Sequence, residues 1–494
     1  MASIELITVI GLILITYICI HIFCRSKKDH DLFKPIPGPF ALPIIGNLID
    51  IYRAGYQIEE LMVKWAKEYG RVFRIKFGPK NIYVLNDFQL ISDAFHHVGI
   101  QARPEQKVPM KIFGPGTGIA FANGEVWKEH RRTILNGFRK FGLGQGPLEE
   151  KISEEANKLT KAIHRFNGQP MDVSNTFSKA SCNIISSLLF DKQLEHDSPI
   201  LKNDVSHVLN SISSAGPAGL FSTSSLFAYL RPGKIFLEAN KNMKKNLDAS
   251  INQHLQKDNS SYCDLVDVYL ERLQETGGPD VPFSKTNLTW FVRDLYIAGT
   301  ETVSSILRWA TLLLMTHPEV QRRCQAELDE VVGRERYPTL ADRTNLPYLN
   351  ATMLEIFRFG DISPLGVNHL ATADVDLSGY RIPKGSLVIS NTHALMTDPS
   401  RWPEPEAFRP ERHLDKAGNF VKAKEIIPFG IGRRACVGEK LARTEYFLWL
   451  SRLLHQFHFQ LPDDGSPVPN IHKGRTGVVR MAPPFRVRFK PRGL

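Results

Sequence analysis

Residues 428–438, PFGIGRRACVG, restrict the possible folds of this chain more than any other segment. They combine three glycines, two arginines and one cysteine ahead of a long helical pattern. Glycines let the backbone approach a flat ligand closely. Cys436 would stand at the start of that helix beside Arg433 and Arg434, where positive potential favours the thiolate, the form that binds metal. Taken alone, such a cysteine is more often a buried, small hydrophobic residue.

Two further segments place polar residues on long helical patterns. Residues 284–315 predict a helix of roughly 45–50 Å at about 1.5 Å per residue, and its centre reads AGTET (298–302). Gly299 costs about 1 kcal/mol there relative to alanine, so this segment alone would suggest a kinked core helix with capped hydroxyls. EIFR places Glu355 and Arg358 on one helical face, which by itself describes a surface ion pair.

The cysteine segment resembles the haem-binding signature of the cytochrome P450 family, whose fixed positions are filled here by Phe429, Gly432, Arg434, Cys436 and Gly438. The resemblance implies haem b as cofactor, with Cys436 as axial iron ligand, Phe429 packed near the sulfur and Arg434 paired with a propionate. WKEHRR and PLGVNH resemble the family's other haem-contacting segments. The implied cofactor-binding set is Trp127, Arg131, Ala298, His369, Phe429, Arg434, Cys436 and Gly438. Asn368 stands where many relatives have proline, and His369 could equally be an ordinary loop histidine.

AGTET resembles the family's oxygen-binding groove. The resemblance implies that Gly299 leaves room beside the iron, while the catalytic residues Glu301 and Thr302 organise proton delivery to dioxygen. EIFR and the later FRPERHL resemble the family's structural network, formed here by Glu355, Arg358 and Arg412. If that network is buried, removal of one partner should cost about 3–5 kcal/mol.

The N-terminal run from Leu6 to Cys24, LITVIGLILITYICIHIFC, has no charged residue and is long enough to cross a bilayer as a helix. Arg25, Lys27 and Lys28 follow it, so the rest of the chain should face the cytosol. A cleaved signal peptide would need a basic start, a shorter apolar stretch and a small-residue cleavage site, which are missing. We therefore expect a signal anchor at 1–28, a basic and proline-rich hinge at 29–47, and a location in the endoplasmic reticulum membrane.

Residues 48–494 predict a single haem-binding monooxygenase domain, mainly α with small β-sheets (α+β) and a cytochrome P450-like fold. RVFRIKFG and NIYVLN predict short strands, helical patterns dominate from Gly124 to about residue 350, and YRIPKGSLVIS predicts further strands. The chain has 494 residues, ample for a large core, and no repeat or low-complexity linker divides it.

The net charge of +11 favours a membrane surface or an acidic protein as partner. Nucleic-acid signatures and paired metal-ligand histidines are missing from the sequence, and its six cysteines are too scattered for a disulfide framework. The glycine patterns at 114–118 and 142–146 lack a nucleotide-binding context. NADPH should therefore bind a separate NADPH–cytochrome P450 reductase, with cytochrome b5 as a further candidate partner. The docking surface should include Arg132, Arg139, Lys140, Lys422, Lys424, Arg433, Lys440 and Arg443.

The resemblance extends over nearly the whole chain and is closest to the microsomal branch that hydroxylates steroids, fatty acids and xenobiotics. It implies insertion of one oxygen atom into a C–H bond of a lipophilic molecule. The alternatives are a reductase-independent isomerase or dehydratase and a non-enzymatic haem sensor. The expected substrate pocket draws on residues 101–121, 205–235, 364–368 and 477–479 with Ala298 and Thr302, and residues 213–230 form either a mobile lid or an ordinary loop and short helix.

Overall fold

The computed structural model describes residues 34–78, 80–143, 146–215, 229, 231–256, 264–276 and 283–493. The expected anchor at 1–28 lies outside these residues, as do the first part of the hinge and nearly all of the expected lid at 213–230. Within the described ranges, no helix is both long enough and apolar enough to cross a membrane.

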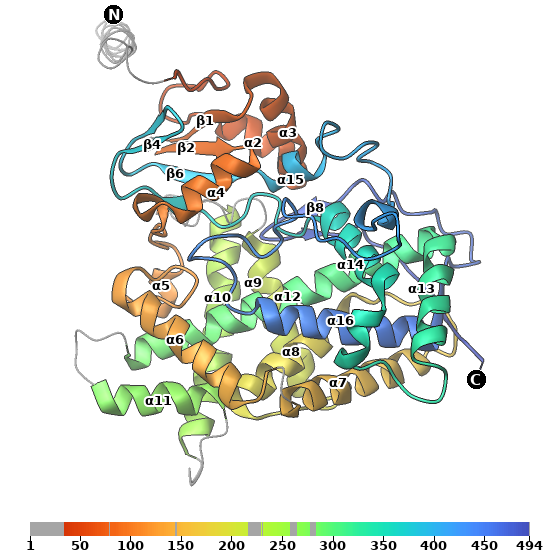
Figure 1. Ribbon diagram of the computed structural model, residues 1–494. Coiled ribbons are helices and arrows are strands. Elements are labelled where there is room, and N and C mark those ends of the chain that lie inside the picture. The colour runs from red at the N-terminus through yellow and green to blue at the C-terminus, as the bar shows by residue number, and fades with distance from the viewer. Residues whose placement is uncertain are drawn as a thin grey trace, which may run out of the picture.

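Helices make up most of the described chain (Figure 1). The longest is α12 (Lys285–Thr316), which has 32 residues and passes through the middle of the molecule. Ser284 caps its start by accepting a hydrogen bond from the Asn287 N–H at 3.0 Å. The other helices are α2 (Leu48–Ala54), α3 (Ile58–Tyr69), α4 (Phe88–His96), α5 (Met110–Phe113), α6 (Gly124–Lys140), α7 (Pro147–His164), α8 (Ser174–Phe190), α9 (Pro199–Ala215), α10 (Arg231–Leu255), α11 (Leu265–Thr276), α13 (Pro318–Val331), α14 (Pro347–Gly360), α15 (Thr392–Met396) and α16 (Glu439–Gln456), with short 3-10 turns at Gly55–Gln57, Val98–Ile100, Leu340–Asn345 and Pro410–His413.

A four-stranded sheet lies at the N-terminal end of the molecule beside α2, α3, α4 and α15 (Figure 1). Its order is β1 (Val72–Phe77), β2 (Lys80–Leu85), β6 (Leu387–Ser390) and β3 (His369–Leu370), and β2 pairs with β6 in parallel. Three two-stranded sheets pair β4 (Val375–Leu377) with β5 (Tyr380–Ile382), β7 (Phe457–Gln460) with β10 (Arg488–Pro491), and β8 (Arg475–Thr476) with β9 (Arg480–Met481). The predicted strands are confirmed: RVFRIKFG and NIYVLN form the β1–β2 hairpin, in which Val72 faces Leu85.

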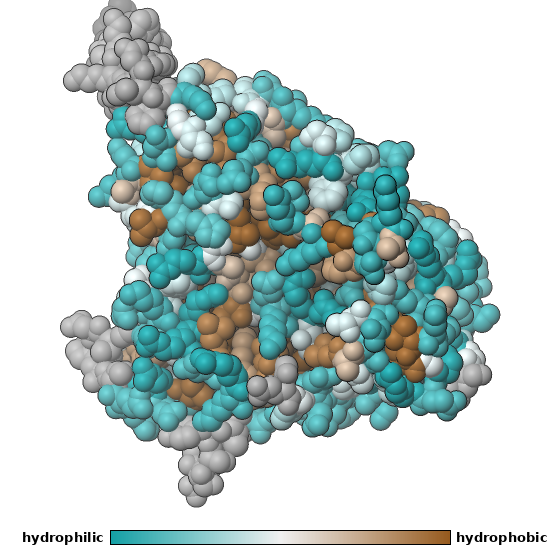
Figure 2. Space-filling view, viewed as in Figure 1, coloured by the Kyte–Doolittle hydropathy of each residue, from teal (hydrophilic) through white to brown (hydrophobic). Residues whose placement is uncertain are grey.

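The largest hydrophobic core surrounds the buried faces of α8, α12, α14 and α16. A smaller core lies under the sheet, where Trp65 of α3 packs edge-on against Phe73 of β1 with ring centroids 6.1 Å apart. On the face drawn in Figure 2, apolar side chains gather between the sheet and the helices, and hydrophilic residues surround them. The predicted mainly helical fold with small sheets is therefore confirmed.

Candidate active site

The cysteine segment forms a compact loop that leads directly into α16, as the sequence predicts. The Cys436 N–H donates to the Phe429 carbonyl oxygen at 2.8 Å and closes the loop. Gly432 has φ of +77°, and a Cβ there would lie 2.3 Å from the Phe95 carbonyl oxygen at the end of α4. Glycine is thus required at position 432, both for this backbone conformation and for the close contact between this loop and α4.

Cys436 differs from the two other cysteines in the described part of the chain, because it is exposed whereas Cys182 and Cys324 are buried. Burial among surrounding protein atoms nevertheless raises the pKa of the Cys436 thiol, while a hydrogen bond from the Gly438 N–H and the charge of Arg131 oppose this rise. The sulfur therefore lies in a recess that a ligand can reach, not on the outer surface. The charge that opposes the rise belongs to Arg131 of α6, whereas the sequence led us to expect that Arg433 and Arg434 would favour the thiolate.

Three buried or half-buried arginines lie on or near the cysteine loop. Arg131 donates to the Ala435 carbonyl oxygen at 2.8 Å, and Arg434 donates to the Gln101 carbonyl oxygen at 2.9 Å. Arg103 donates to the Val367 and Asn368 carbonyl oxygens at 2.6 and 2.9 Å. Within the described part of the chain, no carboxylate forms an ion pair with these arginines.

This arginine cluster is strongly positive and incompletely bonded. Burial, with the charge of Arg434 as a smaller cause, lowers the pKa of Arg103 to about 9. Burial and then the charges of Arg131 and Arg433 lower the pKa of Arg434 to about 10. Nη1 of Arg434 is buried without a hydrogen-bond partner. Because burying like charges together is unfavourable, the cluster would be stabilised by an anionic group such as the two carboxylates of haem.

Two aromatic residues expected to contact haem pack against this cluster or beside it. Trp127 of α6 lies under the guanidinium of Arg434, 4.3 Å from ring centroid to Cζ. His369 stacks on Phe95 with ring centroids 3.9 Å apart, and its Nδ1 lies 2.7 Å from the Ile100 carbonyl oxygen. Burial and then the charge of Arg103 lower the pKa of His369 to about 2. His369 is therefore neutral, with its proton on Nδ1, and its Nε2 would donate to a propionate only after protonation.

On α12, the two predicted catalytic residues differ in environment. Thr302 is partly exposed and the nearby Ala298 is exposed; the Thr302 hydroxyl donates to the Ala298 carbonyl oxygen at 2.7 Å. Glu301 has only 2% of its surface exposed. Gly299 faces α8, where a Cβ would lie 2.2 Å from Cδ1 of Ile185. The structure thus gives Gly299 a packing role between helices, which the sequence alone did not indicate.

The predicted structural network is buried and fully connected. Arg358 donates to both carboxylate oxygens of Glu355 at 2.9 and 2.8 Å, and neither side chain is more than 1% exposed. Arg412 donates to Glu355 Oε1 at 3.2 Å. His413 Nε2 lies 2.9 Å from Glu355 Oε2, and the Arg409 N–H donates to Oε1 at 3.1 Å. This network joins α14 to the turn at Pro410–His413, on the chain segment that leads to the cysteine loop.

Sequence reasoning missed Arg103 and His413. Arg103 lies in an irregular segment, QARPE, that resembles no motif, so no local signal pointed to it. His413 directly follows Arg412 in FRPERHL, and that adjacency was the available signal. Both residues acquire their roles only through contacts with residues distant in the sequence.

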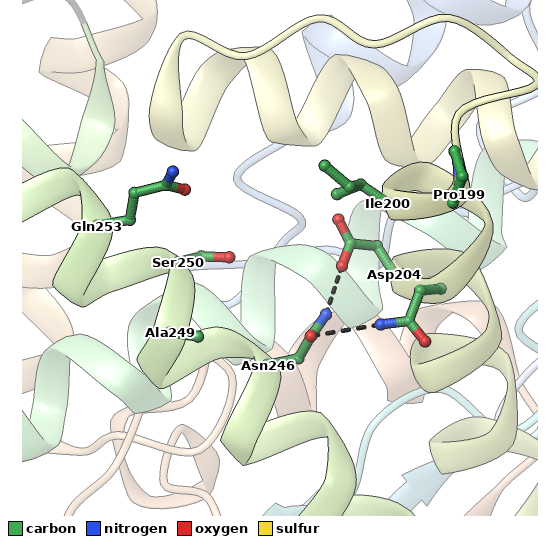
Figure 3. Close-up of a pocket in the computed structure, with 8 residues that line it drawn as sticks. Pro199, Ile200, Asp204, Asn246, Ala249, Ser250 and Gln253 are labelled. Atoms are coloured by element: carbon green, nitrogen blue, oxygen red, sulfur yellow. Dashed lines mark hydrogen bonds between the residues drawn. The ribbon is translucent and has the colours of Figure 1, made fainter.

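A surface depression lies away from this site, between the start of α9 and the end of α10 (Figure 3). It is lined by Pro199, Ile200, Asn203, Asp204, Asn246, Ala249, Ser250 and Gln253. Asn246 donates to Asp204 and accepts from Asn203 (Figure 3). Because none of the predicted site residues lines it, this depression is separate from the site around Cys436.

An exposed cysteine in a glycine-rich loop, close to arginines that lack a carboxylate partner in the described part of the chain, fits the site of a haem-thiolate protein. The family model described as Cytochrome P450 matches residues 36–489, and the chain belongs to that family. The chain is 35% identical to human (Homo sapiens) "Cytochrome P450 2J2" over 87% of this chain and 86% of that protein. It is 33% identical to rabbit (Oryctolagus cuniculus) "Cytochrome P450 2C3" over 99% of this chain and 100% of that protein, and 34% identical to mouse (Mus musculus) "Cytochrome P450 2D9" over 91% of each. Family members are oxidoreductases, monooxygenases that bind haem b through a thiolate.

Proposed function

We propose that this protein hydroxylates a lipophilic small molecule such as a steroid, a fatty acid or a xenobiotic, with NADPH electrons delivered by a separate reductase. The observation that carries the proposal is the open recess in which the exposed Cys436 sulfur lies near buried arginines that have no carboxylate partner. When bound, haem b with a thiolate ligand supplies the redox chemistry that divides dioxygen between substrate and water. The protein must hold that group, exclude water and supply protons.

The residues around the recess suit the holding role. Cys436 would ligate the iron, and Phe429 packs beside the loop, edge-on to Phe357 with centroids 5.6 Å apart and covered by Arg443 at 4.6 Å. Arg131, Arg434 and Trp127 would bind or shield the propionates, and we add Arg103 to this set. Gly438 supplies the N–H that bonds the sulfur. A thiolate that accepts such a bond is stabilised in its charged form.

Proton delivery falls to α12. Thr302 is partly exposed on α12, so its hydroxyl could hold a proton for the reaction. Glu301 is a buried carboxyl whose pKa burial raises, with the charge of Arg308 and hydrogen bonds from Ser305 and Ser304 opposing the rise. A carboxyl with a raised pKa can carry a proton nearer neutral pH than an exposed one.

The substrate pocket should be walled by the loop at 101–121, because α12 holds this loop rigidly. The Thr117 N–H donates to Asn287 Oδ1 at 3.0 Å, and the Ala120 N–H donates to Asp294 Oδ2 at 2.9 Å. Trp290 Nε1 donates to the Gly114 carbonyl oxygen at 3.3 Å. These three α12 residues lie on one helical face, which continues along the helix to Ala298.

A membrane location is supported by an apolar surface near the N-terminal end of the described chain. Exposed there are Phe40, Leu42, Ile44, Ile45, Ile49, Tyr52 and Tyr56, with Phe40, Ile44 and Tyr52 more than 80% exposed. A patch of this kind favours contact with a lipid surface. We propose that it rests on the endoplasmic reticulum membrane beside the anchor at 1–28 and the hinge at 29–47, with the domain at 48–494 in the cytosol.

The proposal is tested by purified protein, reductase and NADPH. We expect oxygen consumption that requires both reductase and NADPH and that produces a hydroxylated product. Turnover without reductase would instead identify an isomerase or dehydratase, and haem binding without any turnover would identify a sensor. A screen of steroids, fatty acids and retinoids for the spectral shift that accompanies displacement of iron-bound water would narrow the substrate class.

A further inference from the structure

Glu301 and Thr302 are neighbours in sequence, but their side chains point to different sides of α12. Successive residues of an α-helix are about 100° apart around its axis. The Thr302 hydroxyl turns back to the Ala298 carbonyl oxygen at 2.7 Å, on the partly open face. The carboxyl of Glu301 is buried and extends the other way along the helix, toward residues one turn later. The two groups do not contact one another in this arrangement.

Two serines hold the Glu301 carboxyl where it lies. Ser305 Oγ donates to Glu301 Oε1 at 3.2 Å, and Ser304 Oγ approaches Oε2 at 3.5 Å and the Glu301 carbonyl oxygen at 3.1 Å. Both serines are completely buried. Their spacings of three and four residues place them on either side of Glu301 on the helix surface. A buried carboxylate held in this way is fixed in one orientation.

The helix α8 closes the remaining side of this arrangement. Ser178 of α8 donates to Ser304 Oγ at 3.3 Å, so Ser304 is itself held in place. Two helical turns earlier, Ser186 of α8 pairs with Tyr296 of α12 at 2.9 Å in the same antiparallel register. A Cβ on Gly299 would lie 2.2 Å from Ile185, which shows how closely the two helices approach. The seam between α8 and α12 is therefore rigid next to Glu301.

We propose that Ser304 and Ser305 are positioning residues that hold the Glu301 carboxyl in a resting orientation against α8, from which it turns toward Thr302 to deliver a proton. This inference rests on the proposed monooxygenase function and adds the residues that control its proton donor. The resting orientation keeps the carboxyl away from the open face of α12. The two serine contacts must break before the carboxyl can serve the Thr302 side.

The charged groups around Glu301 agree with this arrangement. Arg308, one further turn along α12, is the charged residue that acts on Glu301, and Arg308 is in turn affected by Asp172 ahead of α8 and Arg475 of β8. The serine hydroxyls and Arg308 favour the ionised carboxyl, whereas burial disfavours it. Loss of a serine hydroxyl should therefore raise the pKa of Glu301 further, because one stabiliser of the charged form is removed.

The test uses the purified resting holoprotein, without NADPH or reductase. Infrared difference spectra recorded against pH follow the C=O stretch of protonated carboxyls, and the Glu301→Gln variant identifies the band of Glu301. We expect Ser305→Ala, and more strongly the Ser304→Ala, Ser305→Ala double variant, to move the titration of this band to higher pH. Ser451→Ala is the matched control, since Ser451 is equally buried but bonds the Leu448 carbonyl oxygen in α16.

A second measurement follows the same variants during turnover with reductase. We expect more peroxide released per NADPH consumed in Ser305→Ala than in Ser451→Ala, because an unrestrained carboxyl delivers protons less accurately. The proposal is overturned if the Glu301 band titrates unchanged in both serine variants, or if Ser451→Ala shifts it equally. A shifted band in a protein that makes no hydroxylated product would leave the positioning role standing and reject the proposed function instead.

Discussion

Cys436 is the residue on which the haem site depends, and its exposure distinguishes it from the buried Cys182 and Cys324. Serine at position 436 would present a hydroxyl that stays protonated and binds iron poorly. We expect Cys436→Ser to lose the red-shifted carbon monoxide band of the reduced protein. Cys324→Ser is the control, because that sulfur contacts Thr352 Oγ1 at 3.3 Å in the core. Retention of the band in Cys436→Ser would exclude this cysteine as the ligand.

Glu355 is the residue on which the buried network depends. Burial raises the pKa of its carboxyl, but hydrogen bonds from Arg358 and His413 outweigh this, so the folded-state pKa lies below the usual value. Glu355→Gln leaves Arg358 and Arg412 buried without their counter-charge, so we expect a loss of about 3–5 kcal/mol in the free energy of unfolding. Denaturant unfolding and haem content measure this effect.

The matched control is Glu275→Gln, whose ion pair with Arg272 is exposed and should contribute under about 1 kcal/mol. Measurements at several pH values test the direction in which the stability contribution of Glu355 changes. Because the folded-state pKa of Glu355 is depressed, its contribution is present above the unfolded carboxyl pKa and is lost as the pH falls through the folded value. The stability difference between wild type and Glu355→Gln should therefore shrink in acid. Equal effects of both variants at neutral pH would reject a special role for Glu355.

The residues of this network also show which parts of the site could be predicted from the sequence. Glu355 and Arg358 stand three apart on a predicted helix, and Cys436 lies in a dense motif, so their neighbourhoods could be predicted locally. Arg103 and His413 could not, because each meets its partners only after segments more than fifty residues apart fold together. The effect of Arg131 on the Cys436 thiol could not be predicted locally either, because Arg131 lies about three hundred residues earlier in the chain.

At the scale of elements, the close contact between α8 and α12 explains Gly299. The expected cost of Gly299→Ala is about 1–3 kcal/mol from overpacking against Ile185, partly offset by about 1 kcal/mol of helix propensity. Ile185→Ala removes the atoms that the new Cβ would meet. We therefore expect a double-mutant cycle by denaturant unfolding in which Gly299→Ala is better tolerated with Ile185→Ala than alone. Additive effects of the two changes would mean that the helices do not meet at Gly299.

The element boundaries were predictable where the chain has strong local signals. The long helix predicted at 284–315 is α12 (Lys285–Thr316), begun by the Ser284 cap and ended before His317. The strands β1 and β2 appear where alternating apolar residues predicted them. By contrast, the parallel pairing of β2 with β6 joins residues about three hundred apart. No local pattern encodes such a pairing.

At the scale of the whole molecule, part of the positive charge behind the net charge of +11 lies on the surface near the cysteine loop. Lys440, at the start of α16, donates to the Leu143 carbonyl oxygen at 3.0 Å, so the beginning of α16 adjoins the end of α6. Arg139, Lys140 and Lys440 are all exposed there. Of the other members of the expected basic surface, Arg132 pairs with Glu129 and Arg443 with Glu439, whereas Lys422, Lys424 and Arg433 are also exposed. Arg139, Lys140 and Lys440 lie on the adjoining ends of α6 and α16, so we choose these three residues as probes of docking by an acidic reductase.

Reversal of these three charges should slow electron transfer from the reductase, since complementary charges steer association more than they hold the complex. We expect the triple variant Arg139→Glu, Lys140→Glu, Lys440→Glu to be reduced more slowly at low salt. The difference from wild type should narrow as salt screens the exposed charges over about 10 Å at 0.1 M. Stopped-flow reduction by NADPH and reductase measures the rate of electron transfer.

The control reverses the charges of Lys161, Lys473 and Lys490, which are equally exposed but lie on other elements. If both triple variants slow reduction alike, then total charge and not this surface governs docking, because only a local site distinguishes two changes of equal net charge.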